Sequence, residues 1–311
     1  MTRDPGTPAA QTRSGVSAGA SARRWSGDWG RRERPSVPAV DVLVPTSGRT
    51  AELAVTLAGL AGQDGPAFSV LVSDQSPDGS PLSAPAVTAM LRVLAAQGRG
   101  VRSVRHVPRR GLAEHRQFLL DQSSAPMVLM LDDDVWLEPG QLARMVDALT
   151  TLGCGFVGSA VQGLSYLDDV RPAEQQPYEP WDGPVEPEVL RRGSPATARL
   201  SLHNAANLAH VAAARAVPRD GWEAYRVAWV GGCVLFDRAA LVEAGGFEFW
   251  RDLPPEHAGE DVVAQWRVME RRGGAGILPS GAVHLEAPTT VPVRDVDAPD
   301  VLMAPSGAGR G

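Results

Sequence analysis

Three things are scarce in this sequence: cysteine, long apolar runs and surplus positive charge. Only two of the 311 residues are cysteines, Cys154 and Cys233, so a disulfide scaffold is not indicated and a reducing, cytoplasmic setting is the simpler expectation. No run approaches the roughly 18 consecutive apolar residues that a membrane-spanning helix needs. The net charge of −6 argues against a nucleic-acid partner held by bulk electrostatics, so we expect no such partner.

The composition divides the chain into one folded domain and two flanking segments. Residues 1–38 are rich in Gly, Ser, Ala, Pro and Arg, with almost no aliphatic residues, and predict a disordered N-terminal arm. The arginines of this arm are not followed by the apolar stretch of a signal peptide. Residues 291–311 are rich in Pro, Asp and Gly and predict a disordered C-terminal tail. Residues 39–290 between them are predicted to form a single domain with a full core.

Strands and helices are predicted to alternate through the first half of this domain. The apolar, β-branched runs predict strands, and the segments between them carry apolar residues at helical spacing. The expected elements are strands at 40–45, 68–74, 101–107 and 128–131 and helices at 50–62, 86–96 and 111–120. This β-α-β-α order predicts an α/β fold, Rossmann-like, with a mostly parallel central sheet flanked by crossover helices.

The most informative stretch follows the fourth predicted strand, where four apolar residues run directly into Asp132, Asp133 and Asp134. Three like charges cannot share a core, so the strand must end here and the carboxylates must lie at the sheet edge where open α/β sheets bind ligands. In an extended segment Asp132 and Asp134 share one face, and Asp133 points the opposite way. With no Lys or Arg close by in the sequence, this pair predicts a site for Mg²⁺ or Mn²⁺.

A second acidic pair, Glu260 and Asp261, lies far downstream at the start of a predicted helix. Acids in a first helical turn suit the positive end of the helix dipole, which explains both residues without any functional role. Residues 162–220 show no clear periodicity, with Pro, Trp and charged residues mixed. An irregular span of this length is more typical of a functional region than of a plain connection.

Several motifs agree in their order along the chain. They are Pro45-Thr46 after the first strand, Asp74 after the second, Gly111-Leu112-Ala113 with Arg116, Asp132-Asp133-Asp134, Gly231-Gly232, Gly245-Gly246-Phe247, Gly259-Glu260-Asp261 and His284. An Asp-x-Asp alone is common by chance, but the ordered set is much more specific. Over roughly residues 40–288, the chain resembles the family-2 inverting glycosyltransferases with a GT-A fold. The resemblance implies transfer of a sugar from a nucleoside-diphosphate sugar to an acceptor hydroxyl, assisted by Mn²⁺ or Mg²⁺.

The resemblance also implies a role for each matching position. These roles are nucleoside binding by Pro45, Thr46 and Asp74, donor contact by Arg116, Asp132 and Asp133, metal binding by Asp134 and His284, and general base catalysis by Asp261 in a pair with Glu260. The family usually has two acids and a Gly-Ser pair after the second strand, where this chain has Ser73-Asp74-Gln75-Ser76. The preferred nucleotide base therefore stays open.

Sugar transfer needs both acidic sites for physical reasons. A divalent cation stabilises the negative charge that grows on a departing diphosphate. The attacking hydroxyl must lose its proton, so a carboxylate is needed as general base on the other side of the anomeric carbon. One aspartate cluster and one distant acid therefore suffice for a single displacement that inverts the anomeric centre.

Two alternative functions use parts of the same pattern. A nucleotidyltransferase that makes a nucleotide sugar normally has a Gly-rich, basic loop after the first strand, whereas residues 46–50 hold one Gly and one Arg. A non-enzymatic module that binds sugar nucleotide or metal would leave the Gly259-Glu260-Asp261 motif unexplained. The acceptor is open among a glycan, a lipid-linked molecule and a small molecule, and a lipid-linked acceptor would require peripheral membrane contact.

Overall fold

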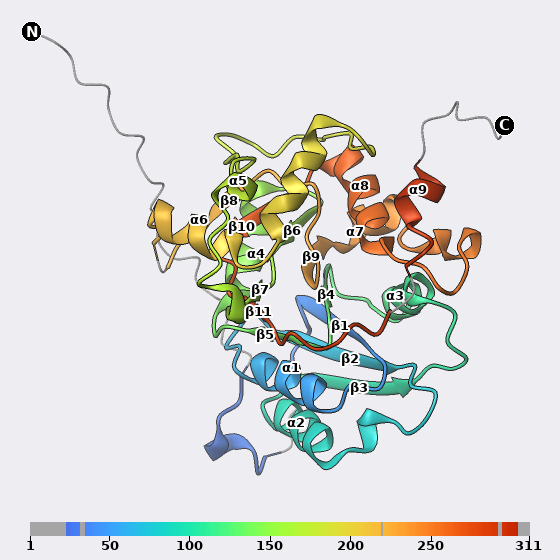
Figure 1. The fold of residues 1–311 in the computed structure, drawn as a ribbon. Coiled ribbons are helices and arrows are strands. Elements are labelled where there is room, and N and C mark those ends of the chain that lie inside the picture. The colour runs from blue at the N-terminus through green and yellow to red at the C-terminus, as the bar shows by residue number, and fades with distance from the viewer. Residues whose placement is uncertain (1–22, 32–34, 219, 292–293, 304–311) are drawn as a thin grey trace, which may run out of the picture.

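The computed structural model describes residues 23–31, 35–218, 220–291 and 294–303, which form two sheets flanked by helices (Figure 1). The strands are β1 (Val40–Thr46), β2 (Phe68–Asp74), β3 (Gly100–Arg105), β4 (Met127–Leu131), β5 (Val135–Leu137), β6 (Phe156–Gly158), β7 (Gln162–Gly163), β8 (Glu223–Tyr225), β9 (Cys233–Asp237), β10 (Ala275–Leu278) and β11 (Ala282–His284). The α-helices are α1 (Ala51–Ala61), α2 (Pro85–Ala96), α3 (Leu112–Asp121), α4 (Gln141–Leu152), α5 (Pro172–Gln175), α6 (Asn207–Arg215), α7 (Arg238–Glu243), α8 (Glu260–Arg272) and α9 (Ala298–Leu302). Short 3-10 helices are η1 (Ser26–Asp28), η2 (Pro81–Ser83), η3 (Leu164–Tyr166), η4 (Pro195–His203) and η5 (Glu248–Asp252).

The larger sheet confirms the prediction of a mostly parallel α/β fold. Its eight strands have the order β3-β2-β1-β4-β9-β6-β10-β8. Strands β3, β2, β1 and β4 are parallel neighbours, and β6 is parallel to β10. Strand β9 runs antiparallel to both β4 and β6, and β8 runs antiparallel to β10. The first four strands therefore end at one edge of the sheet, where their loops can meet.

Both faces of this sheet are covered by helices, which explains why its central strands are continuously apolar. All seven residues of β1 are buried. One hydrophobic cluster joins β1 and β2 to α1, α2 and α4, for example through Leu53, Leu57 and Leu60 of α1. A second cluster on the opposite face joins the sheet to α3, α7 and α8. The helices and strands predicted for the first half of the domain are thus confirmed at their expected positions.

The chain after β4 differs from the prediction. Strand β4 ends at Leu131, and after the three aspartates the chain enters β5, which belongs to a separate sheet of order β5-β11-β7. The backbone NH of Asp132 donates to the carbonyl of Gly232, 2.9 Å away, just before β9 begins. The sequence of residues 228–237 is apolar enough to predict a strand over its whole length. The strand begins only at Cys233, because Gly232 has a φ of +74° that breaks the extended backbone.

The irregular region at residues 162–220 contains short elements joined by side-chain hydrogen bonds. The buried Asn207 on α6 donates from Nδ2 to Glu174 Oε2 on α5 and to the carbonyl of Ser201 on η4, each 3.0 Å away. Gln175 donates to Asn207 Oδ1 at 3.5 Å. Such contacts have no sequence periodicity, which is why no element was predicted here.

The flanking segments are described only in part, and the predicted domain boundaries stay predictions. Of the predicted arm, residues 1–22 and 32–34 lie outside the described residues. The backbone NH of Arg24 donates to the carbonyl of Gln97 at 2.8 Å, which places η1 against the body of the domain. In the predicted tail, residues 294–303 include α9, whose first residue Ala298 is fully buried. The polar composition of these two segments did not predict η1 or α9.

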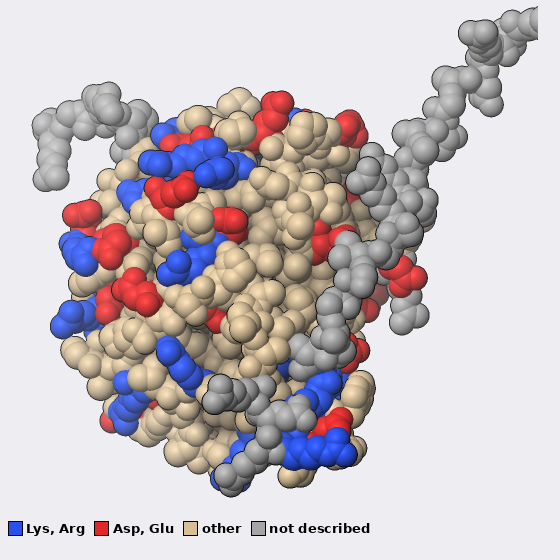
Figure 2. All heavy atoms as spheres, turned by 180° about the vertical axis from the view of Figure 1, so that it is seen from behind, with Lys and Arg blue, Asp and Glu red and all other residues tan. Residues whose placement is uncertain are grey.

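On the face seen in Figure 2, basic and acidic side chains lie side by side rather than gathered by sign. Cys154 and Cys233 are both free and buried. None of the described helices is long and apolar enough to cross a membrane.

Candidate active site

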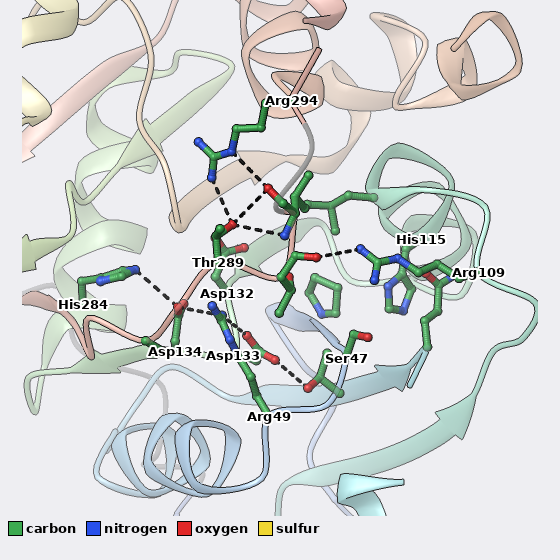
Figure 3. Close-up of a pocket in the computed structure, with 17 residues that line it drawn as sticks. Ser47, Arg49, Arg109, His115, Asp132, Asp133, Asp134, His284, Thr289 and Arg294 are labelled. Carbon is green, nitrogen blue, oxygen red and sulfur yellow. Dashed lines mark hydrogen bonds and ion pairs between the residues drawn. The ribbon is translucent and has the colours of Figure 1, made fainter. Parts of the chain in front are cut away.

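The candidate active site is a pocket at the edge of the sheet where β1, β2 and β4 end (Figure 3). Parallel pairing places Thr46, the last residue of β1, opposite Asp74, the last residue of β2. Pro45 and Thr46 line the pocket, as do Asp132, Asp133, Asp134 and His284. The structure therefore brings together six of the predicted site residues from β1, the β4–β5 link and β11.

The structure corrects the predicted arrangement of the three aspartates. Because the chain turns after Leu131 instead of staying extended, the alternation of side chains does not apply, and all three aspartates line the pocket. Each carboxylate also has a cationic partner from a distant part of the sequence. Arg116 Nη2 donates to Asp132 Oδ1 at 2.9 Å, and Arg49 Nη1 lies 2.8 Å from Asp133 Oδ1 and 2.6 Å from Asp134 Oδ2.

Asp133 is buried, with 5% of its surface exposed. Thr46 Oγ1 donates to Asp133 Oδ2 at 2.6 Å, and Thr56 Oγ1 on α1 donates to its backbone carbonyl at 2.9 Å. Burial raises the pKa of Asp133 to about 6, against the lowering effect of the hydrogen bonds from Thr46 and Arg49. These contacts join the ends of β1 and β4, so Asp133 shapes the pocket floor.

Asp134 and His284 face each other across the pocket (Figure 3), with Nε2 of His284 3.3 Å from Oδ2 of Asp134. Burial opposes ionisation of Asp134, but the hydrogen bond from His284 and the charge of Arg49 lower its pKa overall. The same hydrogen bond raises the pKa of His284. The backbone NH of Glu286 donates to Nδ1 of His284 at 2.9 Å, so the neutral ring carries its proton on Nε2, toward Asp134.

The donor set at this point fits a divalent cation that is completed by substrate oxygens. Within the described ranges, no group of three or more His, Cys, Asp or Glu side chains is arranged to hold a metal alone. Mg²⁺, however, is usually bound by one or two carboxylates together with substrate phosphates. Asp134 and His284 would hold the ion, and the proton on His284 Nε2 would leave as it binds.

Arg116 connects the aspartate cluster to the second acidic pair. From α3, its Nε donates to Glu260 Oε1 at 3.1 Å while its Nη2 donates to Asp132. The Arg116 and Glu260 side chains are each 5% exposed, so this is a buried ion pair. Burial raises the pKa of Glu260, and the charge of Arg116 opposes that rise. Arg116, Asp132 and Glu260 thus form one chain of charged side chains.

Asp261 is held by an indole rather than by a cation. Trp229 Nε1 donates to Asp261 Oδ2 at 2.8 Å. Burial and the neighbouring charge of Glu260 raise the pKa of Asp261 to about 7. A carboxyl group with a pKa near neutrality is poised to accept a proton from a hydroxyl. The helix-dipole explanation alone does not account for this environment.

Asp74 does not reach the pocket that it was expected to line. It is fully buried, and its Oδ1 accepts from the backbone NH of Ser76 at 2.8 Å while its Oδ2 accepts from Ser80 Oγ at 2.5 Å. Both oxygens therefore stabilise the loop that follows β2. The residue from this loop that lines the pocket is Gln75.

The rest of the pocket comes from residues that the sequence did not single out. His115 on α3 and Arg109 before it line one end. The segment after β11 supplies Thr289, Thr290 and Arg294 on the opposite side, as Figure 3 shows for the two that it labels. Arg49 Nη2 donates to the carbonyl of Pro288 at 2.5 Å, and Arg109 Nη2 donates to that of Thr290 at 3.1 Å. These two hydrogen bonds hold the C-terminal segment over the pocket.

A signal for some of these residues was present in the sequence. Arg49 comes shortly after the end of the first strand. A residue in that position is expected near the edge of the sheet where the pocket lies. The contact of Trp229 with Asp261 links positions 32 residues apart across two loops, and no local pattern indicates it.

Comparison with known proteins identifies the family. The chain matches glycosyl transferase family 2 over residues 41–210, more than half of its length, and it belongs to this family. The resemblance expected from the motifs and the α/β fold of the GT-A type are thereby confirmed. No curated protein sequence matches the chain.

Two similar solved structures are of longer chains. One is the mannosyltransferase PcManGT from Pyrobaculum calidifontis, in complex with GDP-Man and Mn²⁺, at 18% identity and a TM-score of 0.47, with 80% of this chain and 61% of that chain covered. Another is S. aureus TarS 1–349, at 15% identity and a TM-score of 0.47, with 76% of this chain and 57% of that chain covered. This chain therefore spans less than two thirds of either one.

Proposed function

We propose that the protein transfers a sugar from a nucleoside-diphosphate sugar to an acceptor hydroxyl, with inversion at the anomeric carbon and with help from Mn²⁺ or Mg²⁺. The observation that carries this proposal is the buried Arg116, which contacts both Asp132 in the pocket and Glu260 beside Asp261. This contact supports an anionic donor bound next to a carboxyl group whose pKa is about 7.

The donor would lie along the pocket, with its nucleoside near Pro45 and Thr46 and its diphosphate near Asp134 and His284. A cation bound there would supply stabilisation of the charge that develops on the diphosphate. Arg49, Arg109 and Arg294 also line the pocket and offer guanidinium groups to phosphate oxygens. Asp132, with 35% of its side chain exposed, is accessible to the sugar nucleotide, and Arg116 holds its carboxylate in place.

Asp261 would act as the general base. The acceptor oxygen forms a bond to the anomeric carbon as the bond from that carbon to the diphosphate oxygen breaks. The hydroxyl proton passes to a carboxylate oxygen of Asp261, and the nucleoside diphosphate leaves with the bonding electron pair. A single displacement of this kind inverts the anomeric centre, and no sugar becomes attached to the protein.

The first experiment is a thermal-shift screen of sugar nucleotides with and without Mn²⁺. A donor that binds only the folded state raises the melting temperature, by an amount set by its concentration relative to its Kd. We expect at least one sugar nucleotide to stabilise the protein in a Mn²⁺-dependent way, and EDTA should reverse the effect. If no sugar nucleotide stabilises the protein with either metal, the proposal fails.

Two variants separate the roles of the acids. Asp134→Ala should abolish Mn²⁺-dependent donor binding, whereas Asp261→Asn should keep donor binding and lose transfer. Glu243→Gln is the matched control, because Glu243 is an exposed acid on α7 whose partner Arg272 lies 3.0 Å away. Transfer at the normal rate by Asp261→Asn would place the base elsewhere, with Glu260 as the next candidate.

A further inference from the structure

We propose that Gln75, together with His115, recognises the base of the donor nucleotide and selects a pyrimidine with a ring N–H between two carbonyls, as in uracil and thymine. This inference rests on the proposed function, since it concerns the nucleotide of that donor. It starts from Asp74, whose oxygens accept hydrogen bonds from Ser76 and Ser80 and which does not line the pocket.

Gln75 and His115 lie together at one end of the pocket. Both line it, although they are only 2% and 3% exposed. The backbone NH of Gln75 donates to the carbonyl of Thr46 at 3.0 Å, which fixes it beside the end of β1. His115 Nε2 lies 2.8 Å from the hydroxyl of Ser73, the residue opposite Pro45 in the β1–β2 ladder. Pro45 and Leu112 line the same pocket and offer apolar surface to a flat ring.

The orientation of the Gln75 amide is fixed by Glu114. Gln75 Nε2 donates to Glu114 Oε2 at 3.2 Å, and the other oxygen of Glu114 lies 2.8 Å from His106 Nε2. A carboxylate accepts hydrogen bonds and does not donate them, so the amide nitrogen must face Glu114. Gln75 Oε1 then faces elsewhere, and no donor to it is found among the described residues. Gln75 lines the pocket, so this acceptor without a protein partner is open to a ligand there.

His115 adds a second group without charge. Burial lowers its pKa to about 3, so the ring is neutral at physiological pH. Its Nε2 is engaged with Ser73, and within the described part of the chain its Nδ1 has no hydrogen-bond partner. A neutral Nδ1 can donate or accept, depending on which nitrogen carries the proton.

These groups match one kind of base better than the others. The ring N–H of uracil or thymine is a single donor, which pairs with the single fixed acceptor Gln75 Oε1. Guanine presents two adjacent N–H donors, which are best met by a carboxylate, but both oxygens of Glu114 are already engaged. Cytosine and adenine have an unprotonated ring nitrogen where uracil and thymine carry the N–H, so a base in the same position would face Gln75 Oε1 with a lone pair. Only their exocyclic amino group could donate to Gln75 Oε1, and the base would have to shift to bring it there. The preference is therefore for UDP or dTDP over GDP, CDP and ADP.

Calorimetric titration of the full chain with these five nucleoside diphosphates tests the preference. UDP or dTDP should bind about tenfold more tightly than the other three, because a mismatched base leaves a buried polar group unpaired. Comparison of UDP with dTDP shows whether the thymine methyl group is accepted. Tighter binding of GDP, CDP or ADP would overturn the inference and leave the proposed function standing. Failure of all five to bind would overturn both.

Two further measurements assign the preference to Gln75. UDP methylated at N3 of uracil lacks the N–H, and it should bind about tenfold more weakly than UDP to the unaltered protein. Gln75→Leu should weaken the binding of UDP by a similar factor and leave the binding of inorganic pyrophosphate unaffected. Glu114→Gln, which frees the amide to rotate, should lower the ratio of UDP to GDP affinity.

The matched control is Gln97→Leu. Gln97 is 4% exposed and donates from Nε2 to the carbonyl of Ala61 at 3.0 Å, outside the pocket. This variant should keep the full preference for UDP even if it loses stability. An unchanged preference in Gln75→Leu, or equal binding of UDP and its N3-methyl form, would contradict the assignment.

Discussion

Replacement of Trp229 by Phe tests whether Asp261 is the general base. The indole N–H donates to Asp261 Oδ2 at 2.8 Å and lowers the pKa of this carboxyl, which burial and Glu260 raise to about 7. A hydrogen bond to an ionised acceptor contributes about 1.5 kcal/mol, which is about a tenfold change in an ionisation equilibrium. Phe keeps most of the ring's packing and removes this donor, so Asp261 should need a higher pH to ionise.

The assay is the pH dependence of kcat/KM for sugar transfer. A base works only when deprotonated, so the rate should rise with pH through about 7 in the unaltered protein. In Trp229→Phe the midpoint should move up by about one pH unit, with a loss of about tenfold at pH 6 and less than about twofold at pH 9. A uniform loss at all pH values would refute the assignment of Asp261 as base.

Trp266→Phe is the matched control for this experiment. Trp266 lies on the same helix, and its Nε1 donates to the carbonyl of Ala228 at 2.7 Å instead of to a carboxylate. Loss of this buried hydrogen bond should reduce the free energy of unfolding without moving the pH midpoint.

Three other predictions concern stability. Arg116→Ala should lower the free energy of unfolding by about 3–5 kcal/mol, because it leaves Glu260 buried without its cation. The double variant Arg116→Ala with Glu260→Gln should recover part of this loss, as measured by chemical denaturation. Gly111→Ala should destabilise the protein by more than about 1 kcal/mol, because Gly111 has a φ of +104° and a Cβ there would lie 2.6 Å from His257 Cε1; Gly79→Ala, at a φ of +61° with open space around it, should cost less. The pKa of Asp261 is raised from 3.8 to about 7, so between these pH values the native state keeps a proton that the unfolded chain loses. The contribution of Asp261 to the free energy of unfolding should therefore decline as pH rises across that range. In thermal melts, Asp261→Asn should flatten this decline.

The sequence predicted the sheet and the position of the pocket because both depend on local pattern. Apolar runs that end in polar residues mark where parallel strands stop, and such strands stop at the same edge. The Asp132–Asp134 cluster and the first strand were placed correctly on this basis. The family match then confirmed the family that the ordered motifs indicated.

The partners of the polar residues were not predictable in the same way. Arg49 reaches Asp133 across 84 positions, and Arg116 reaches Glu260 across 144. Such pairs form when the sheet brings its loops together, and nothing near either residue in the sequence indicates the other. Asp74 shows the converse case, since its motif position suggested a place in the pocket, whereas it lies outside the pocket lining and two nearby serines donate to its carboxylate.

The small sheet formed by β5, β11 and β7 determines how sensitive the proposed cation site is to insertions in the chain. His284 on β11 pairs with Val135 on β5, the residue directly after Asp134, and the backbone NH of Leu285 donates to the carbonyl of Asp134 at 2.9 Å. The spacing between the two side chains that we propose as metal ligands is thus set by strand register. A shift of one residue in this ladder would turn His284 to the opposite face. A single-residue insertion between β10 and β11 should therefore impair metal binding as severely as removal of the imidazole, although every ligand would still be present in the chain.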